Sequence, residues 1–515
     1  MLTRLKVSGF KNLVDVDVRF GAFTCIAGVN GVGKSNLFDA IAFLSSLAEK
    51  SLLDAALSVR DDGSHSGGDL RSIFHRVGDT YAPEMSFEAE MIVPPKGEDD
   101  LGQVAIVPAK GEDDMSQMAK AAITFLRYKL KLGYRLDERP SAGGIEILHE
   151  ELTYIKKGEA KENLPFPHDG KWQSSVVTGQ RFGKGFISTA TEREQVVIKV
   201  HQDGGSQGRA NGLLARTLPR TALSAASAAE SPTALLAKCE MKSWRRLQLE
   251  PSCLRMPDAF SAPTRISSDG SHLAANLYEL ARSPQLFPGW KGNGHTERIY
   301  TEIANRLSNL IDDVTEVSID KDDKRELYTL MVAGRDHTKL TARSLSDGTL
   351  RFLALGVLQM DPRVQGVLCL EEPENGIHPA RIPAMLRLLY DVAADVFEPV
   401  STDNPLRQII INTHSPAVVA QAPDDSVLMA EPVSQVDDSG VRFTGLTFRC
   451  LPGTWRAKLS GANPVPKGNV LSYLSPFEPH SLIRLPGTAL PAECAVTRVI
   501  DRKDVREALL WEVSA

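Results

Sequence analysis

The stretch Gly28-Val-Asn-Gly-Val-Gly-Lys-Ser35 constrains the fold of this 515-residue chain more than any other feature. It fits the pattern G-x-x-x-x-G-K-[ST], in which glycines let backbone N–H groups turn inward around phosphate oxygens. The apolar run 22–29 predicts a buried strand, and residues 37–50 have the apolar spacing of a helix. A strand, a glycine loop and a helix in this order predict a nucleotide-binding P-loop, not merely a glycine-rich turn.

The chemistry of such a loop assigns roles to its residues and predicts ATP and Mg²⁺ as ligands. Lys34 is expected to reach the β- and γ-phosphates, and the Ser35 hydroxyl is expected to face Mg²⁺. The helix that starts there also points its positive end at the anion. The residues of this segment expected to bind the nucleotide are Asn30, Gly31, Val32, Gly33, Lys34, Ser35 and Asn36.

A second informative stretch is 368–379, LCLEEPENGIHP, in which an apolar run ends in two adjacent carboxylates, Glu371 and Glu372. Like charges at the end of a buried strand are costly unless a cation faces them. Ligands of open α/β sheets lie at the carboxyl ends of the strands. We therefore expect Glu371 to hold Mg²⁺ and Glu372 to act as the general base for the attacking water. A solvated acidic turn is the plainer alternative, and the P-loop disfavours it.

Two further segments suggest contacts with an anion. The run 408–416, QIIINTHSP, predicts another buried strand with a polar end, and His414 is expected to contact the γ-phosphate. The run 344–355, SLSDGTLRFLAL, has a polar glycine turn directly before an apolar helix. By itself the second pattern is a capped helix start, whose N-terminus is able to bind an anion.

Strands alternating with helices predict an α/β protein with a parallel sheet. A helix is expected to begin at Ser231-Pro232 and to carry residues 233–248. Near-duplicate acidic segments at 93–103 and 107–117 predict a small duplicated hairpin or loop. The expected parts are a lobe with the P-loop and an antiparallel extension (1–200), a mostly helical insertion (201–325), a second lobe (326–435) and a small C-terminal α/β extension (436–515).

The composition indicates a globular protein and limits the choice of partners. Hydrophobic residues make up 42% of the chain, and the net charge of −6 excludes a uniformly basic nucleic-acid coat but not a local basic patch. The six cysteines form no CxxC pair, the N-terminal residues lack a signal-peptide pattern, and no run of eighteen apolar residues occurs. We expect a cytoplasmic protein with reduced thiols and no association with membranes.

Taken together and in this order, the four segments resemble the ABC-type ATPases of the SMC/RecF/OLD group. The P-loop GVNGVGKSN is similar to that of the group, and LSDGT at 345–349 resembles its signature sequence. LCLEEPENGIHP resembles the Walker B strand and D-loop of the OLD-like branch, and NTHSP resembles its H-loop. The resemblance covers 1–60 and 340–420. It implies an α/β, ABC-type P-loop ATPase head with a mixed sheet, a β-rich first lobe and a helical insertion.

The resemblance also implies a mechanism in which two heads enclose two ATP molecules, so a homodimer or higher oligomer is expected. Ser346 and Gly348 of the signature would then contact the γ-phosphate on the P-loop of the other head. The opening LKVSGFKNL looks like the group's first strand, and Lys11 matches its basic residue near the nucleotide. ATP would close the dimer, and hydrolysis would open it.

The sequence departs from the group at several positions. The first hundred residues hold no glutamine for a Q-loop, so His75 or a backbone group is the expected substitute. In the signature, Asp347 and Thr349 replace the usual Gly and Gln. No long coiled-coil pattern lies between the P-loop and the signature, and no nuclease-like pattern follows His414.

The chain also resembles the stand-alone ATPase subunits of bacterial anti-phage systems, because the motor is recognisable and no effector pattern is. This resemblance implies a nucleotide-driven switch or sensor in anti-phage defence, with a separate nuclease or toxin subunit. The alternative is a RecF-like ATPase in DNA repair that binds nucleic acid. Its candidate contacts are the basic segments 181–186 and 242–248. A transporter ATPase is disfavoured by the long insertion and by the Glu-Glu-Pro-Glu sequence.

Overall fold

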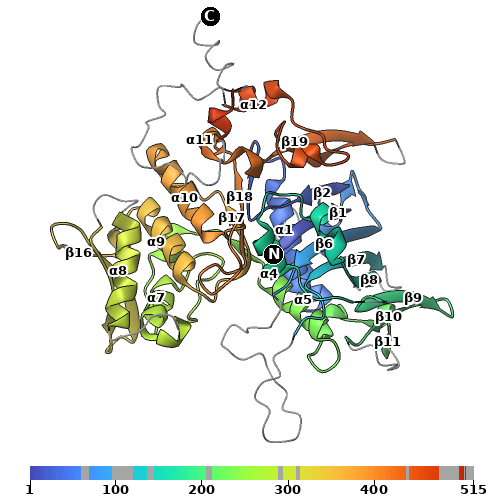
Figure 1. Ribbon diagram of the computed structural model, residues 1–515, viewed down its shortest axis with the longest axis horizontal. Helices are drawn as coiled ribbons and strands as arrows, with labels where there is room; N and C mark the ends of the chain where they lie inside the picture. The colour runs from blue at the N-terminus through green and yellow to red at the C-terminus, as the bar shows by residue number, and fades with distance from the viewer. Residues whose placement is uncertain are drawn as a thin grey trace, which may run out of the picture.

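The computed structural model (Figure 1) describes most of the chain, and the fold below is that of the described residues. These are 1–59, 69–94, 120–135, 144–181, 183–203, 211–287, 294–308, 314–436, 440–474, 498–503 and 505. Apart from residues 93 and 94, the two near-duplicate acidic segments lie outside the described residues.

A six-stranded sheet with the order β12-β17-β18-β3-β19-β20 forms the centre of the molecule. Its strands are β3 (Phe23–Ala27), β12 (Arg245–Leu247), β17 (Gly366–Glu371), β18 (Arg407–Thr413), β19 (Val427–Val436) and β20 (Arg442–Cys450). All neighbours are parallel except β19 and β20, which form an antiparallel pair. Every residue of β3 and β18 is buried, as is typical of strands covered on both faces.

Side chains of the central strands alternate between two hydrophobic cores. Cys369 and Ile410 join the core that contains α1 (Lys34–Leu47), whereas Leu370 and Ile411 join the core that contains α9 (Asp347–Met360) and α10 (Ile382–Val392). Figure 1 shows α1 on one side of β17 and β18 and the other two helices on the opposite side. The predicted α/β fold with a mixed sheet is therefore confirmed, and helices cover both faces of its parallel strands.

An eight-stranded antiparallel sheet forms the β-rich part of the first lobe, with the order β11-β10-β9-β8-β7-β6-β1-β2. Each neighbouring pair is antiparallel. The strands are β1 (Leu2–Ser8), β2 (Val16–Arg19), β6 (Glu84–Ile92), β7 (Phe125–Arg135), β8 (Gly144–Tyr154), β9 (Ile187–Glu192), β10 (Gln195–Val200) and β11 (Asn211–Leu214). Two short strands, β4 (Arg76–Val77) and β5 (Thr80–Tyr81), form a separate pair.

Further helices surround the sheets, together with a small sheet of β13 (Asp258–Ala259), β14 (Glu316–Asp322), β15 (Leu327–Ala333) and β16 (Lys339–Thr341). The helices are α2 (Leu52–Leu57), α3 (Ala160–Asn163), α4 (Gly170–Val176), α5 (Pro232–Lys242), α6 (Pro251–Leu254), α7 (Leu273–Arg282), α8 (His295–Ser308), α11 (Pro416–Gln421) and α12 (Lys467–Leu474). Among the described helices, none has the length and apolarity that a membrane crossing needs.

The helix expected to carry residues 233–248 is shorter than predicted. It ends at Lys242, and Arg245–Leu247 instead form β12, which pairs in parallel with β17. Trp244, at the break, is buried, and its indole N–H donates to Glu240. Pairing with the edge of the central sheet has overridden a local pattern that also suits a helix.

Arg407, at the start of β18, fastens this strand to the end of α9. Its guanidinium is buried and donates to the carbonyls of Val364 (2.5 Å), Gln359 (2.7 Å) and Asp361 (2.7 Å). Burial lowers the pKa of Arg407 to about 10, so the group stays charged at neutral pH. These bonds supply donors to carbonyls at and beyond the end of α9, where the intrahelical N–H donors run out.

Replacing Arg407 by Met should lower the free energy of unfolding by about 3–5 kcal/mol, because three buried carbonyls lose a charged donor. Urea denaturation followed by circular dichroism measures the change. The matched control is Arg343→Met at an exposed position, for which a change within about 0.5 kcal/mol is expected. Equal effects of the two substitutions would contradict the anchoring role.

Candidate active site

The P-loop is organised around the ammonium group of Lys34. Its Nζ donates to the carbonyls of Gly28 (2.7 Å) and Val29 (2.9 Å). Burial lowers the pKa of Lys34, and the nearby carboxylates Glu372 and Glu374 partly oppose this effect. The amine is therefore held inside the loop, where a phosphate oxygen could replace the carbonyl acceptors.

A side-chain bridge supports the loop from outside. Asn12 donates to the Val32 carbonyl (2.9 Å) and accepts from the Asn36 amide (2.8 Å). Gly33 has a φ of 98°, and a Cβ there would lie 2.2 Å from Asn12 Nδ2, so this position requires glycine. The sequence prediction missed Asn12, although it directly follows Lys11 in the segment matched to the group's first strand.

The tip of the loop lies open to solvent. Asn30 and Gly31 are exposed, as is Val29, whose exposed fraction is 58%. The structure thus places the predicted loop residues around one turn, with Lys34 at its centre. Their individual contacts with a nucleotide stay predictions.

Glu372 lies at the carboxyl edge of the central sheet in a strained backbone conformation. Its φ is 43°, and its backbone N–H donates to the side chain of Asn412 (2.9 Å). Its carboxylate accepts from Asn375 (2.8 Å) and lies 2.8 Å from His414 Nδ1. Burial would raise the pKa of Glu372, but these two hydrogen bonds and the charge of Lys34 outweigh it and lower the pKa. Glu372 is therefore ionised at neutral pH, as a general base must be.

Asn412 joins the Glu372 strand end to the P-loop helix. Besides the Glu372 N–H, its amide lies 3.5 Å from the Ser35 hydroxyl. The strand register explains this position, because Asn412 pairs with Glu371 on one side and with Ile26 on the other. The sequence analysis passed over Asn412, although it precedes His414 by only two residues at the end of a buried run.

Glu374, the third carboxylate, is buried behind Glu372. It accepts a hydrogen bond from Thr413, and its other oxygen has no partner among the described residues. Burial raises its pKa. Tyr473 of the C-terminal helix α12 lies close by: burial and then the neighbouring Cys25 raise the pKa of its hydroxyl, with a smaller contribution from Glu374. The C-terminal segment therefore reaches the base of the site, which the sequence did not predict.

Glu371, the expected metal ligand, is paired with an arginine from β12. Arg246 Nε lies 2.7 Å from its carboxylate, and Arg246 Nη1 lies 3.1 Å from Asp39 on α1. Asp39 also pairs with Lys11 (3.0 Å). Lys11, the basic residue expected near the nucleotide, and Arg246 therefore share the Asp39 carboxylate. We call Lys11, Asp39, Arg246 and Glu371 the charge network.

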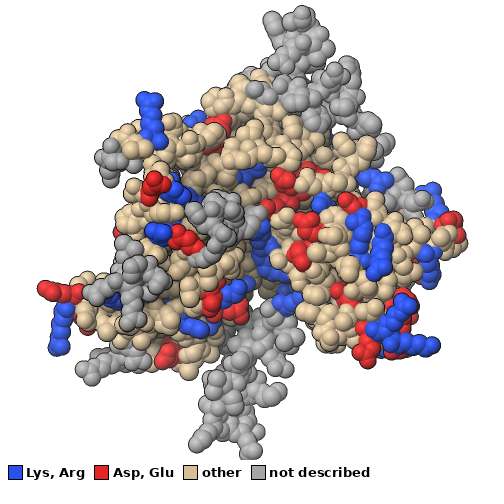
Figure 2. Space-filling view, turned by 180° about the vertical axis from the view of Figure 1, so that it is seen from behind, with Lys and Arg blue, Asp and Glu red and all other residues tan. Residues whose placement is uncertain are grey.

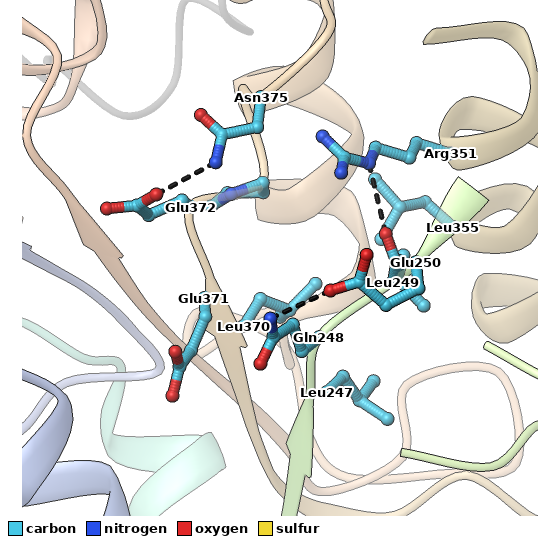
Figure 3. Close-up of a pocket in the computed structure, with 11 residues that line it drawn as sticks. Leu247, Gln248, Leu249, Glu250, Arg351, Leu355, Leu370, Glu371, Glu372 and Asn375 are labelled. Atoms are coloured by element: carbon cyan, nitrogen blue, oxygen red, sulfur yellow. Dashed lines mark hydrogen bonds between the residues drawn. The ribbon is translucent and has the colours of Figure 1, made fainter. Parts of the chain in front are cut away.

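Gln248 directly follows β12, at the same edge of the sheet as Glu371. Its amide donates to Glu250 (2.8 Å), and its oxygen accepts from Arg246 (3.3 Å). Gln248 lines a pocket of about 80 Å³ together with Glu371, Glu372 and other residues of β17 and α9 (Figure 3). The Gln248 side chain thus lies beside the expected metal ligand Glu371. Its sequence position, within a segment with helical spacing and far beyond the first hundred residues, gives no sign of this place.

His75, the expected substitute for a Q-loop glutamine, lies elsewhere. Its Nδ1 is 2.6 Å from the Lys11 carbonyl, and its ring packs on Phe443 of β20, with 4.8 Å between the ring centres. The position of His75 gives its predicted role no support, whereas that of Gln248 fits the role.

The signature residues lie at the start of α9. Ser346 is exposed and caps the helix by accepting from the Thr349 N–H (3.2 Å), and Asp347 is ion-paired with Arg255. A Cβ on Gly348 would lie 3.2 Å from the Gly376 carbonyl, so the signature packs closely on the loop that follows Glu372. The contact of Ser346 and Gly348 with a nucleotide of another head stays a prediction.

The donors at this edge fit a magnesium ion. Ser35, Glu371 and Gln248 offer hydroxyl, carboxylate and amide oxygens, which Mg²⁺ prefers over nitrogen or sulfur. The carboxylate of Glu371 already faces a cation, the Arg246 guanidinium, so its position is suited to positive charge. Ser35 and Glu371 are the residues that would hold Mg²⁺, and this assignment stays a prediction.

Comparisons with known proteins agree with this site. A family model described as "AAA domain, putative AbiEii toxin, Type IV TA system" matches residues 23–98 and 285–420. These ranges contain the P-loop, the signature, both adjacent carboxylates and His414. No curated protein matches the sequence.

Solved structures of SMC heads are also similar at low sequence identity. A SmcHead bound to the C-winged helix domain of ScpA aligns over 86% of this chain and 97% of its own, with 12% identity and a TM-score of 0.42. The Smc head with an extended coiled coil, bound to a ScpA domain from Pyrococcus furiosus, covers 87% of this chain and 96% of its own at 12% identity, with a TM-score of 0.39. The Thermotoga maritima SMC head covers 86% and 97% at 12% identity, with a TM-score of 0.33.

The likeness to anti-phage subunits is not part of these matches and stays a prediction. Lys34 and Glu372 meet at one edge of the central sheet, and over residues 23–98 and 285–420, which contain all of these motifs, the chain is similar to that family of AAA domains.

Proposed function

We propose that this chain binds ATP with Mg²⁺ at the carboxyl edge of the central sheet, hydrolyses it, and uses the nucleotide to join two heads. The observation that carries the proposal is the bridge made by Asn412, which lies between Ser35 of the P-loop helix and the backbone of Glu372. It brings a phosphate-binding turn and an ionised carboxylate to the same place.

The residues suggest how hydrolysis proceeds. Lys34 exchanges its loop carbonyls for phosphate oxygens, and Glu372 takes a proton from the attacking water. Asn375 and His414 fix the direction of that carboxylate. When bound, Mg²⁺ would neutralise negative charge on the phosphate oxygens.

Exposed surfaces around the two motifs support a sandwich of two heads. Val29 at the P-loop tip is 58% exposed, and Met256, next to the arginine that pairs with Asp347, is also 58% exposed. Single exposed apolar side chains are common on protein surfaces, so these two residues support the sandwich only through their places beside the P-loop and the signature. We propose that the P-loop face of one copy covers the signature face of another, with Ser346 and Gly348 at the enclosed nucleotide.

We further propose that this switch acts in anti-phage defence on a separately encoded nuclease or toxin. Support comes from the resemblance of the motifs to OLD-like ATPases and from the toxin named in the family description. Purification of the tagged protein from its native cells, with and without phage, tests this role. A nuclease or toxin that copurifies would support it, and recovery of the homo-oligomer alone would count against it.

The DNA-repair alternative receives less support because its candidate cations serve internal contacts. Arg181 donates to the carbonyls of Lys184 and Asp203 and stacks on Phe186, and Arg246 pairs with carboxylates. On the face in Figure 2, Lys and Arg are interspersed with Asp and Glu. A nucleic-acid groove would instead gather cations along one stripe.

Lys34→Ala should reduce nucleotide affinity by about 100-fold or more, because the loop loses its only lysine and the cation that faces the phosphates. Titration with a fluorescent ATP analogue measures this affinity. Lys50→Ala, at an exposed lysine beyond the end of α1, is the control and should bind as the wild type does. Unchanged affinity in Lys34→Ala would rule out the P-loop role.

Glu372→Gln should retain nucleotide binding and slow hydrolysis by about 100-fold or more, because only the proton acceptor is lost. Phosphate release under saturating ATP measures turnover, and the nucleotide titration checks binding. Glu326→Gln, an exposed change in a hairpin turn, serves as the control. Turnover at the wild-type rate would place the base elsewhere.

Ser346→Arg should abolish ATP-dependent dimerisation and leave binding to the monomer intact, because a long cation would enter the proposed interface. Light scattering of the Glu372→Gln background, with and without ATP, measures the mass. Ser308→Arg, at an exposed serine of α8, controls for the added charge. Normal dimers of the Ser346→Arg protein would argue against the sandwich.

A further inference from the structure

We propose that Arg246 is the internal counter-ion of Glu371, and that a metal ion must displace it from this carboxylate when nucleotide binds. The inference rests on the proposed ATP site and adds a positioning residue to it. Arg246 belongs to none of the motifs that identify the ATPase. It enters the site because β12 is a strand of the central sheet and not a helix end.

The strand register fixes Arg246 beside Glu371. Arg246 pairs with Cys369 of β17, and Cys369 belongs to the core on the α1 side of the sheet. Because strand side chains alternate, Glu371 points to the same side as Cys369, and so does Arg246. The guanidinium therefore lies between Glu371 and Asp39 on α1, at 2.7 and 3.1 Å.

The burial of these groups makes their charges interdependent. The exposed fractions of the side chains are 20% for Arg246, 11% for Glu371 and 3% for Asp39. Two carboxylates so poorly hydrated require cations nearby, and Arg246 and Lys11 are cations that contact them. A divalent ion at Glu371 would bring two positive charges next to the Arg246 guanidinium, so Arg246 would be repelled from that carboxylate.

Arg246 has other acceptors available when it leaves Glu371. Asp39 stays within reach of Nη1, and the Gln248 oxygen lies 3.3 Å from Nη2. Gln248 and Glu371 also line a pocket of about 80 Å³ (Figure 3). The exchange thus trades one ion pair for a metal contact without leaving the guanidinium unpaired.

The ion pair between Arg246 and Glu371 should weaken Mg²⁺ binding, because the metal must compete with the guanidinium for the Glu371 carboxylate. We expect Arg246→Gln to lower the Mg²⁺ concentration that half-saturates nucleotide binding by about five-fold, the equivalent of one partly exposed ion pair. Arg246→Lys keeps the positive charge but loses the fork of donors that contacts Glu371 and Asp39, so its Mg²⁺ requirement should lie between those of Arg246→Gln and the wild type. Asp39→Asn removes the second carboxylate that holds Arg246 and should raise the Mg²⁺ requirement.

The experiment titrates a fluorescent, non-hydrolysable ATP analogue at graded Mg²⁺ concentrations and in EDTA. Circular dichroism confirms folding, and Arg306→Gln, which loses an ion pair with Glu302 away from the site, is the matched control. A lower Mg²⁺ requirement in Arg246→Gln, with unchanged affinity in EDTA, supports the inference. If that variant does not fold, the rise expected for Asp39→Asn decides the question.

Three results would overturn the inference. An unchanged or higher Mg²⁺ requirement in Arg246→Gln would show that the pair does not compete with the metal. A loss of affinity in EDTA would show that Arg246 binds the phosphates directly. If the wild type itself bound no nucleotide at any Mg²⁺ concentration, the proposed function would fail and the inference with it, whereas in the first two results the wild type still binds ATP.

Discussion

The parallel pairing of β17, β18 and β3 is the constraint on which the site depends. Their register places Glu371, Asn412 and Ile26 side by side, so three segments far apart in the chain end at one edge. The P-loop then begins directly beyond β3, and Glu372 and His414 follow the other two strands. A shift of one residue in any of these strands would turn its polar end to the opposite face.

Charge at this edge is balanced before any ligand arrives. Lys34 is held by carbonyls, Glu371 by Arg246, and Glu372 by Asn375 and His414. Each group therefore has a partner that ligand binding must replace, which limits the net gain from any single contact. This exchange of hydrogen-bond and ion-pair partners suits a switch. The free and the nucleotide-bound states would contain similar numbers of paired polar groups and would differ in which groups are paired.

The sequence predicted those parts of the structure whose residues follow a recognisable spacing along the chain. The glycine spacing around Lys34 and the apolar runs before Glu371 and His414 identified the central strands and the fold class. The prediction from sequence failed where a neighbouring strand decides whether a segment becomes a helix or a strand. The segment around Arg246 has no strand alternation strong enough to outweigh its helical spacing, and only the exposed edge of β17 makes it a strand.

Three of the residues that the sequence did not predict act on a motif from outside it. Asn12 supports the P-loop, Arg246 holds Glu371, and Tyr473 lies at the base of the site from α12. These residues are brought to the groups they contact by the fold and not by a fixed spacing in the sequence. A motif pattern, which relies on fixed spacing, therefore cannot identify them. The motifs therefore specify which reaction the fold can perform, whereas these surrounding side chains set the charge and packing under which it begins.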